Sequence, residues 1–330
     1  MSCVQAYSDM DQKEFADVVE QVAEGITRLA EPLADRLLNC FLIDDQGQQV
    51  LFDAGLPGSV TRRLDSGQID GPISQLIVSH ADADHLGDAA ALKRRFPEMQ
   101  IGCHAFDQQR CEDHDLLVHE RYDHARNRFD YGYGDETLAA LREACGDDFV
   151  VDRTLCEDQL LRFGDREWCV LHLPGHSPGH VALWHEAQGI LLGGDVVLGL
   201  GPGNASGCPA MPGTHEDIPA YLATIDRLEK LDVELALLGH WPPLDRSGFQ
   251  ELLEQSRTHV ERDVDAIRTA LRKGGVWTFA ALMDLLNDRF SSWDADSAQH
   301  YSYALAGYLH FLVSRGELSI TDQGLITITT

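Results

Sequence analysis

Ten consecutive residues, Ser79–Asp88, carry two histidines and three aspartates in the order SHADADHLGD, directly after an apolar run. Imidazole nitrogens and carboxylate oxygens are the usual protein ligands of zinc, iron and manganese. In an extended loop, residues two apart project to the same side, so His80, Asp82 and Asp84 can converge. His85 can face a second centre where the chain turns into the next helix. The segment therefore predicts a metal-binding loop.

Three other loops carry a candidate ligand after an apolar run: His176 in LPGHSPGH, Asp195 in LLGGD and His240 in LLGHWPP. A single histidine or aspartate at a strand end is more often a cap or turn residue than a ligand. Four such loops, each beside glycine or proline, together favour convergence on one site. We therefore predict a metal centre that is assembled from four separate loops.

These segments resemble the motifs of the metallo-β-lactamase superfamily, whose usual first motif is HxHxDH. FLIDDQGQQVLFDAG is similar to its opening hairpin, and LPGHSPGH, GGDVV and GHWPP are similar to its later ligand loops. The resemblance covers nearly the whole chain. It implies an α/β fold of the αββα type, a sandwich of two sheets between helices, with two metal ions at one edge of the sheets.

The resemblance also implies a ligand set. The first metal would be bound by His80, Asp82 and His176, the second by Asp84, His85 and His240, and Asp195 would bridge the two. Asp84 is further expected to relay a proton to the leaving group. Asp53 in LFDAG resembles an aspartate that orients the metal loop from behind.

Asp82 stands where the superfamily pattern has a histidine. The extra carboxylate is expected to lower the net charge of the site by one unit and to raise the pKa of the nucleophilic water. Oxygen ligands also shift preference towards iron or manganese. We expect two divalent ions and prefer zinc, because imidazoles remain the majority of the ligands. Iron or manganese is the alternative that Asp82 introduces.

Other polar and aromatic residues near these motifs are expected to have supporting roles. His180 is predicted to support the site without binding metal, and three further histidines are predicted to be structural or exposed: His104, His172 and His185. Three tyrosines of the polar stretch that follows the metal loop could shape an acyl pocket or donate to an oxyanion, although packing is the role expected of any one of them: Tyr122, Tyr131 and Tyr133.

Alternating apolar runs, loops and helices over residues 1–248 predict a catalytic domain, with an insert at about 103–150 that is long enough to form a cap. From residue 249 the pattern becomes helical, and LSITDQGLITIT predicts a terminal hairpin around Asp322–Gly324. Three helices and a hairpin over 249–330 suggest a small winged-helix domain. A similar domain is appended in a branch of the superfamily that contains hydrolases, acyl thioesterases and an endoribonuclease.

The 330 residues include 54 acidic and 26 basic residues, which gives a formal net charge of −28. Such a chain repels phosphate backbones, so we expect no nucleic-acid partner. The acidic N-terminus does not resemble a signal peptide and no apolar run is long enough to span a bilayer, so we expect a cytoplasmic protein without membrane contact. The eight cysteines form no CxxC pair, and we expect buried free thiols.

The leading hypothesis is a hydrolase that cleaves an ester, thioester or lactone of a small-molecule substrate through a metal-bound hydroxide. A phosphodiesterase or ribonuclease of the same superfamily is the first alternative, and a diiron redox enzyme is the second. A binding protein on a degenerate hydrolase scaffold is the non-enzymatic alternative. The C-terminal segment is expected to act in packing or in homodimer formation.

Overall fold

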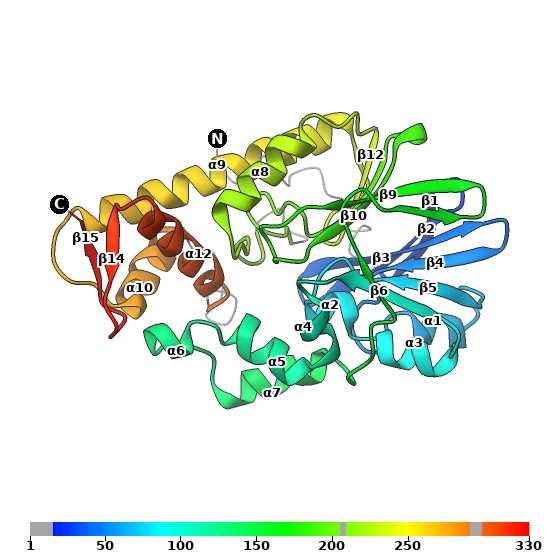
Figure 1. Cartoon of the computed structure of the whole chain (residues 1–330), viewed down its shortest axis with the longest axis horizontal. Coiled ribbons are helices and arrows are strands. Elements are labelled where there is room, and N and C mark those ends of the chain that lie inside the picture. Colours follow the sequence, from blue (N-terminus) through cyan, green and yellow to red (C-terminus); the bar gives the residue numbers. More distant parts are fainter. Residues whose placement is uncertain (1–15, 205–208, 291–298, 330) are drawn as a thin grey trace.

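The computed structural model describes residues 16–204, 209–290 and 299–329. Two β-sheets pack face to face, and helices cover both outer faces (Figure 1). The first sheet has the strands in chain order, β1 (Val18–Ala23), β2 (Ile26–Leu33), β3 (Arg36–Asp45), β4 (Gln48–Phe52), β5 (Ile73–Ile77), β6 (Gln100–His104) and β7 (Arg153–Leu155). The strands β1–β4 pair antiparallel, and β4–β7 pair parallel.

The second sheet has the order β13-β12-β11-β10-β9-β8. Its strands are β8 (Leu160–Phe163), β9 (Arg166–His172), β10 (Val181–His185), β11 (Ile190–Gly194), β12 (Leu235–Leu238) and β13 (Leu244–Asp245). All neighbours pair antiparallel except β11 and β12, which run parallel. The αββα architecture that the sequence predicts is therefore confirmed.

Side-chain alternation along β3 shows how one strand serves two cores. Phe41 and Ile43 pack between the two sheets, whereas Cys40 and Leu42 pack on the opposite face against helices. Successive residues of a strand point to opposite faces, so a strand covered on both sides reads as a continuous apolar run. Trp168 on β9 is wholly buried in the layer between the sheets.

Helices α1 (Thr61–Asp65), α2 (Ala83–Leu86) and α3 (Ala89–Arg95) follow β4 and β5 and lie beside the first sheet. Helix α8 (Ile218–Leu228) and the first part of α9 (Arg246–Leu271) cover the second sheet. Asp217 caps α8 by accepting a hydrogen bond from Ala220 N–H, and Asp245 caps α9 in the same way. These caps fix where each chain segment leaves a ligand loop or strand and turns into a helix.

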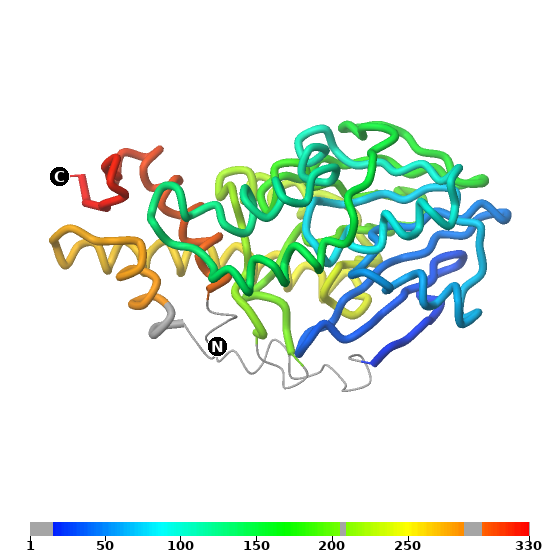
Figure 2. Tube along the Cα trace, turned by 90° about the horizontal axis from the view of Figure 1, so that it is seen from below, coloured from blue at the N-terminus to red at the C-terminus, as the bar shows by residue number. Residues whose placement is uncertain are grey.

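The insert consists of short helices on one side of the sandwich: α4 (Gln108–Glu112), α5 (His114–Leu117), the π-helical turn η3 (Val118–Tyr122), α6 (Arg126–Phe129) and α7 (Asp135–Ala144). It reaches the C-terminal helices, which lie beside it in both views (Figures 1 and 2). Phe129 stacks on Phe279 with ring centroids 4.4 Å apart, and the Tyr133 hydroxyl lies 2.8 Å from His300 Nδ1.

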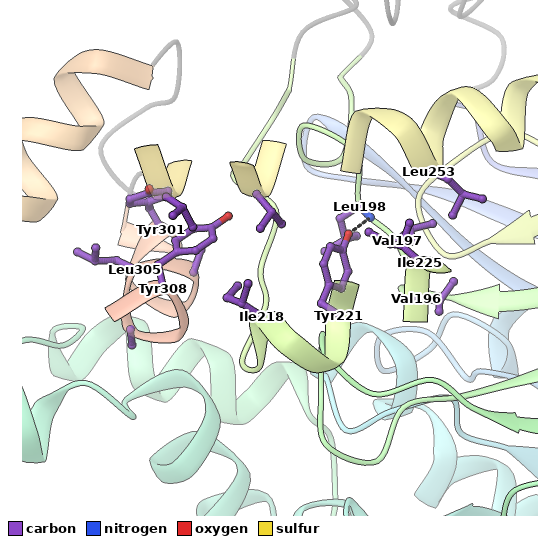
Figure 3. Close-up of a cluster of buried hydrophobic side chains, with 14 of the residues drawn as sticks. Val196, Val197, Leu198, Ile218, Tyr221, Ile225, Leu253, Tyr301, Leu305 and Tyr308 are labelled. Carbon is purple, nitrogen blue, oxygen red and sulfur yellow. Dashed lines mark hydrogen bonds between the residues drawn. The ribbon is translucent and has the colours of Figure 1, made fainter. Parts of the chain in front are cut away.

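The C-terminal segment contains α10 (Phe279–Phe290), α12 (Tyr301–Ser314) and a hairpin of β14 (Leu318–Ile320) and β15 (Ile326–Ile328). The predicted helices and hairpin are confirmed, and the winged-helix assignment and the domain boundary at 248 remain predictions. Helix α9 runs from the second sheet to α10, so it belongs to both packing units. Figure 3 shows Tyr221 of α8 beside Leu198, whose N–H donates to the tyrosine hydroxyl at 3.0 Å.

Among the described residues, no helix is both long and apolar enough to cross a membrane. The described cysteines are free, and four of them are buried, but Cys156 is exposed and Cys169 is half-buried. The expectation of buried thiols is therefore wrong at these two positions. Cys3 and Cys208 lie outside the described residues.

Candidate metal centre

The loop that follows β5 places four predicted ligands at one edge of the sandwich. His80 and His85 are wholly buried, and the chain is extended at Asp82, with φ −123° and ψ 148°, before α2 begins. Helix α2 turns Asp84 and His85 away from the preceding residues. This change from extended to helical backbone allows one short segment to serve two neighbouring positions.

The first cluster joins this loop to the loop between β9 and β10. His80 Nε2 lies 3.1 Å from His176 Nε2, and the Oδ2 atom of Asp82 lies 3.3 Å and 3.0 Å from these two nitrogens. Three donor atoms of this kind, each about 3 Å from the others, surround a point that a metal ion could occupy. The structure brings these three predicted ligands together.

The second cluster contains Asp84, His85 and His240, whose donor atoms all lie within 4.8 Å of one another. Asp195 stands between the clusters. Its Oδ1 lies 3.4 Å from His85 Nε2, and its Oδ2 lies 3.1 Å from His240 Nε2 and 4.0 Å from His176 Nε2. All seven residues that the sequence singled out thus converge at the carboxyl-terminal ends of β5, β11 and β12 and the loop after β9.

The chemistry of this donor set fits a cation. In each of the four histidines, Nδ1 faces an oxygen atom: Ser79 Oγ for His80 at 2.9 Å, Asp53 Oδ2 for His85 at 2.8 Å, Thr214 O for His176 at 2.8 Å and Leu37 O for His240 at 2.6 Å. An imidazole that donates from Nδ1 presents a lone pair at Nε2. The Nε2 atoms therefore converge as acceptors, and His85 Nε2 and Asp195 Oδ1 are buried without a hydrogen-bond partner in the described part of the chain.

Two buried aspartates hold these loops in place. Asp53 accepts hydrogen bonds from Ser79 N–H at 2.7 Å and Ser79 Oγ at 2.8 Å, in addition to its contact with His85. The expected position of Asp53 behind the loop is therefore confirmed. Asp107, which the sequence reasoning missed, accepts from Ala81 N–H at 3.0 Å and Gly179 N–H at 2.8 Å. It thereby ties the two ligand loops of the first cluster together.

The four histidines that the sequence predicts not to bind metal make other contacts. His180 is wholly buried, and its Nε2 accepts a hydrogen bond from Asp195 N–H at 3.1 Å. His104 and His172 stack on each other with ring centroids 3.9 Å apart, and His185 Nδ1 lies 3.0 Å from the Glu167 carbonyl. None of these three rings belongs to a metal-ligand cluster of the described chain.

The expectation that Asp82 lowers the net charge of the site requires correction, because Arg121 neutralises it. Arg121 Nε donates to Asp82 Oδ1 at 2.9 Å, and Nη2 donates to Oδ2 at 2.8 Å. Burial alone would raise the pKa of Asp82, but the neighbouring guanidinium of Arg121 holds it well below its usual range. Asp82 therefore remains a carboxylate, and its charge is paired.

A pocket of about 200 Å³ opens beside the two clusters. Its wall combines apolar side chains of four separate segments with Arg36, Tyr122 and ligand residues. The Tyr122 hydroxyl accepts a hydrogen bond from Ala83 N–H at 2.7 Å. Tyr131 and Tyr133 are not among the residues that line this pocket, so the acyl-pocket role is wrong for them. They pack against the C-terminal helices, Tyr131 on Phe279, which is the structural role expected of them.

Comparison with known proteins supports this geometry. Residues 34–240 match the family model described as the metallo-beta-lactamase superfamily. A probable metallo-hydrolase of Bacillus subtilis (strain 168) is 28% identical over 36% of this chain, and the match spans only 37% of that protein. A hydroxyacylglutathione hydrolase of Xanthomonas euvesicatoria pv. vesicatoria (strain 85-10) is 25% identical over 70% of this chain and 72% of that protein.

Among solved structures, a beta-lactamase domain protein from Burkholderia ambifaria superposes with a TM-score of 0.73. It is 22% identical, and the match covers 95% of this chain and 94% of that chain. The shared fold therefore extends beyond the region of the family model into the C-terminal helices.

Proposed function

Because this chain belongs to the metallo-beta-lactamase superfamily and is a metal-dependent hydrolase, we propose that it cleaves a thioester, ester or lactone with two divalent metal ions. The observation that carries the proposal is the convergence of histidine Nε2 and carboxylate oxygen atoms beside an apolar pocket, with His85 Nε2 and Asp195 Oδ1 buried and unpartnered among the described residues. His80, Asp82 and His176 would hold one ion, and Asp84, His85 and His240 the other. Asp195 would contact both. We propose zinc, with iron or manganese as the alternative.

The two ions, when bound, would activate water and polarise the carbonyl that is attacked. The protein's own groups have separate tasks. Asp53 and the carbonyl of Leu37 fix the ring orientations of His85 and His240. Asp84 faces the pocket and is partly exposed, so it is the carboxylate that is best placed to pass a proton to the leaving group.

The pocket favours a small acyl substrate. Its walls include the apolar side chains of Leu33, Leu56, Leu141, Leu198 and Met211. A volume of about 200 Å³ accommodates a short acyl group but not a folded polymer. The hydroxyacylglutathione hydrolase relatives act on a thioester, and they motivate thioesters as the first class to test.

The test combines metal analysis with a substrate panel. Protein purified without added metal should contain about two transition-metal ions per chain. Metal-replete protein should hydrolyse an acyl thioester, an aryl ester or a lactone faster than bis-p-nitrophenyl phosphate. Activity should disappear on chelation and return with metal. One ion or none per chain would contradict the dinuclear model, and a preference for the phosphodiester would favour the phosphodiesterase alternative.

A further inference from the structure

Arg121 makes an unusual set of contacts beside the first cluster. Besides its two hydrogen bonds to Asp82, its Nη1 donates to the His176 carbonyl at 2.8 Å and to Glu216 Oε1 at 2.7 Å. Its guanidinium carbon lies 5.5 Å from the centre of the Tyr303 ring. Only 2% of the Arg121 side chain is exposed, so the guanidinium has one well-defined position.

The local backbone explains how the arginine reaches this position. Arg121 lies in η3, the π-helical turn over Val118–Tyr122, between α5 and α6 of the insert. A π-helical turn is uncommon and is found most often at functional sites, because it redirects side chains that a regular α-helix would place elsewhere. The insert therefore contributes a charged group to a site whose ligands all come from the sandwich.

Two carboxylates face Arg121, and one of them has a second cation. Glu216 lies 3.1 Å from Arg110 Nη1 as well as near Arg121, and Arg110 also contacts the more exposed Glu120 at 3.4 Å. The positive charge of Arg121 is then available to offset the negative charge of Asp82. A neutral histidine at position 82, with no arginine beside it, would contribute a net charge of zero. Asp82 and Arg121 together contribute the same net charge to the first metal position.

We propose that Asp82 and Arg121 form one neutral ligand unit, in which Arg121 is a positioning residue that offsets the carboxylate charge and aims Oδ2 at the first metal position. Asp82 Oδ1 accepts from Arg121 Nε, whereas Oδ2 accepts from Nη2 and also faces His80 and His176. Arg121 Nη2 itself lies 3.1 Å from His176 Nε2. The inference rests on the proposed function, since it concerns the affinity of the first metal position. It explains how an aspartate can replace a histidine there only together with an arginine.

A double-mutant cycle tests the unit through metal binding, measured by chelator competition and by the absorption of the cobalt-substituted protein. Asp82→His leaves the guanidinium uncompensated beside the cation, and we expect affinity at the first position to fall roughly 10- to 100-fold. The double variant Asp82→His/Arg121→Met removes the extra charge and should restore affinity. Arg142→Met is the matched control, because it removes another arginine of the insert, whose partners Asp115 and Asp148 belong to no metal-ligand cluster of the described residues.

The outcomes separate this inference from the proposed function. If the unchanged protein binds no metal, the proposed function fails. If it binds two ions but Asp82→His binds as tightly as the unchanged protein, or the double variant binds no better than Asp82→His, only the ligand unit is wrong. A variant that keeps one ion, at the second position, is folded.

If Asp82→His loses both ions, the single variant Arg121→Met provides the test of the ligand unit. Its unpaired carboxylate should make the metal-induced rise in Tm larger than in the unchanged protein. An equal or smaller rise would overturn the proposal.

Discussion

Two groups of buried histidine and aspartate lie in this chain, and they differ in what their polar atoms face. The metal centre gathers seven histidines and aspartates at the edge of the sandwich, and all of them except Asp82 and Asp84 are buried. The second group, His215, His259 and Asp263, lies where α8, α9 and α12 meet, and each of the three is wholly buried. Residue types and burial alone do not distinguish the two groups.

In the metal centre, neighbouring groups keep the carboxylates charged. Burial would raise the pKa of Asp195, but His240 and His85 hold it well below its usual range. In the second group, burial prevails: it raises the pKa of Asp263 to about 6 and lowers the pKa of His259 to about 3. Burial therefore favours the neutral forms of Asp263 and His259 in the second group, whereas the metal centre keeps carboxylate charges that a cation can neutralise.

Geometry makes the same distinction. His215 has no hydrogen-bond partner at either ring nitrogen among the described residues, but its ring stacks on Tyr221 at 4.1 Å and lies 6.1 Å from the His259 ring. Within the described parts of the chain, the second group does not form a metal-ligand cluster. Convergence of unpartnered lone pairs, more than burial of polar residues, thus identifies the functional site.

The largest expected effect comes from the aspartate between the two clusters. Asp195→Asn removes a charge that faces His240 and His85, and we expect a loss of metal and a fall in hydrolytic activity on the order of 10³-fold, since a metal ion supplies several kcal/mol of transition-state stabilisation. Metal content measures the first effect, and kcat/KM measures the second. Asp263→Asn is the matched control, a buried aspartate that should leave the metal content unchanged. Equal metal loss in both variants would remove the distinction between the groups.

Asp263 should instead control how stability depends on pH. Its folded-state pKa of about 6 lies above the ordinary value of 3.8, so protonation favours the folded state at low pH and this contribution is lost as the pH rises through 6. Asp263→Asn should gain stability relative to the unchanged protein by roughly 2 kcal/mol between pH 4 and pH 8. Denaturant unfolding at several pH values measures the difference. A difference that is constant with pH would contradict the assignment.

Asp107 tests whether the loops of the metal centre must be tied together. Asp107→Asn places an amide N–H where a carboxylate oxygen accepts from backbone N–H groups, and we expect metal affinity at the first position to fall roughly 10- to 100-fold. Asp152→Asn is the control, because Asp152 also accepts a backbone hydrogen bond, from Ile101 N–H at 2.8 Å, away from the metal centre. Chelator competition compares the two variants, and equal affinities would show that the tie is dispensable.

The ligand loops could be predicted because each ligand stands after an apolar strand, where the signal is local. The sandwich followed from the resemblance of these loops to the superfamily motifs. The same signal could have identified Asp107, which follows the strand that ends at His104. The two N-terminal strands, β1 and β2, were not predicted because charged and polar residues interrupt their apolar alternation. The Val18–Ala23 segment, VVEQVA, is one example.

Arg121 could not be predicted from local pattern. It lies 39 residues from Asp82 in sequence, in a charged stretch that reads like a solvated helix face. Its position depends on the π-helical turn and on how the insert packs against the sandwich. Consequently the sequence revealed the extra carboxylate without its counter-ion, and the net charge predicted for the site omitted the positive charge of Arg121.

Two guanidinium groups of the pocket, those of Arg121 and Arg36, differ in their hydrogen-bond partners. Arg121 is held by Asp82 and Glu216, whereas Arg36 Nε is buried without a hydrogen-bond partner among the described residues. Both side chains line the pocket. A buried donor without a partner costs free energy that an acceptor on a ligand can recover. A substrate that carries a carboxylate would supply that acceptor.

Arg36→Met keeps the length of the side chain and removes the donor. For an acyl thioester that carries a free carboxylate, we expect KM to rise about 10-fold with kcat nearly unchanged, because a hydrogen bond to a charged group contributes ~1.5 kcal/mol or more. The matched neutral thioester should keep its KM, and Arg36→Lys should recover part of the loss by retaining the charge. If KM rises equally for the charged and neutral substrates, Arg36 shapes the pocket wall without binding an anion.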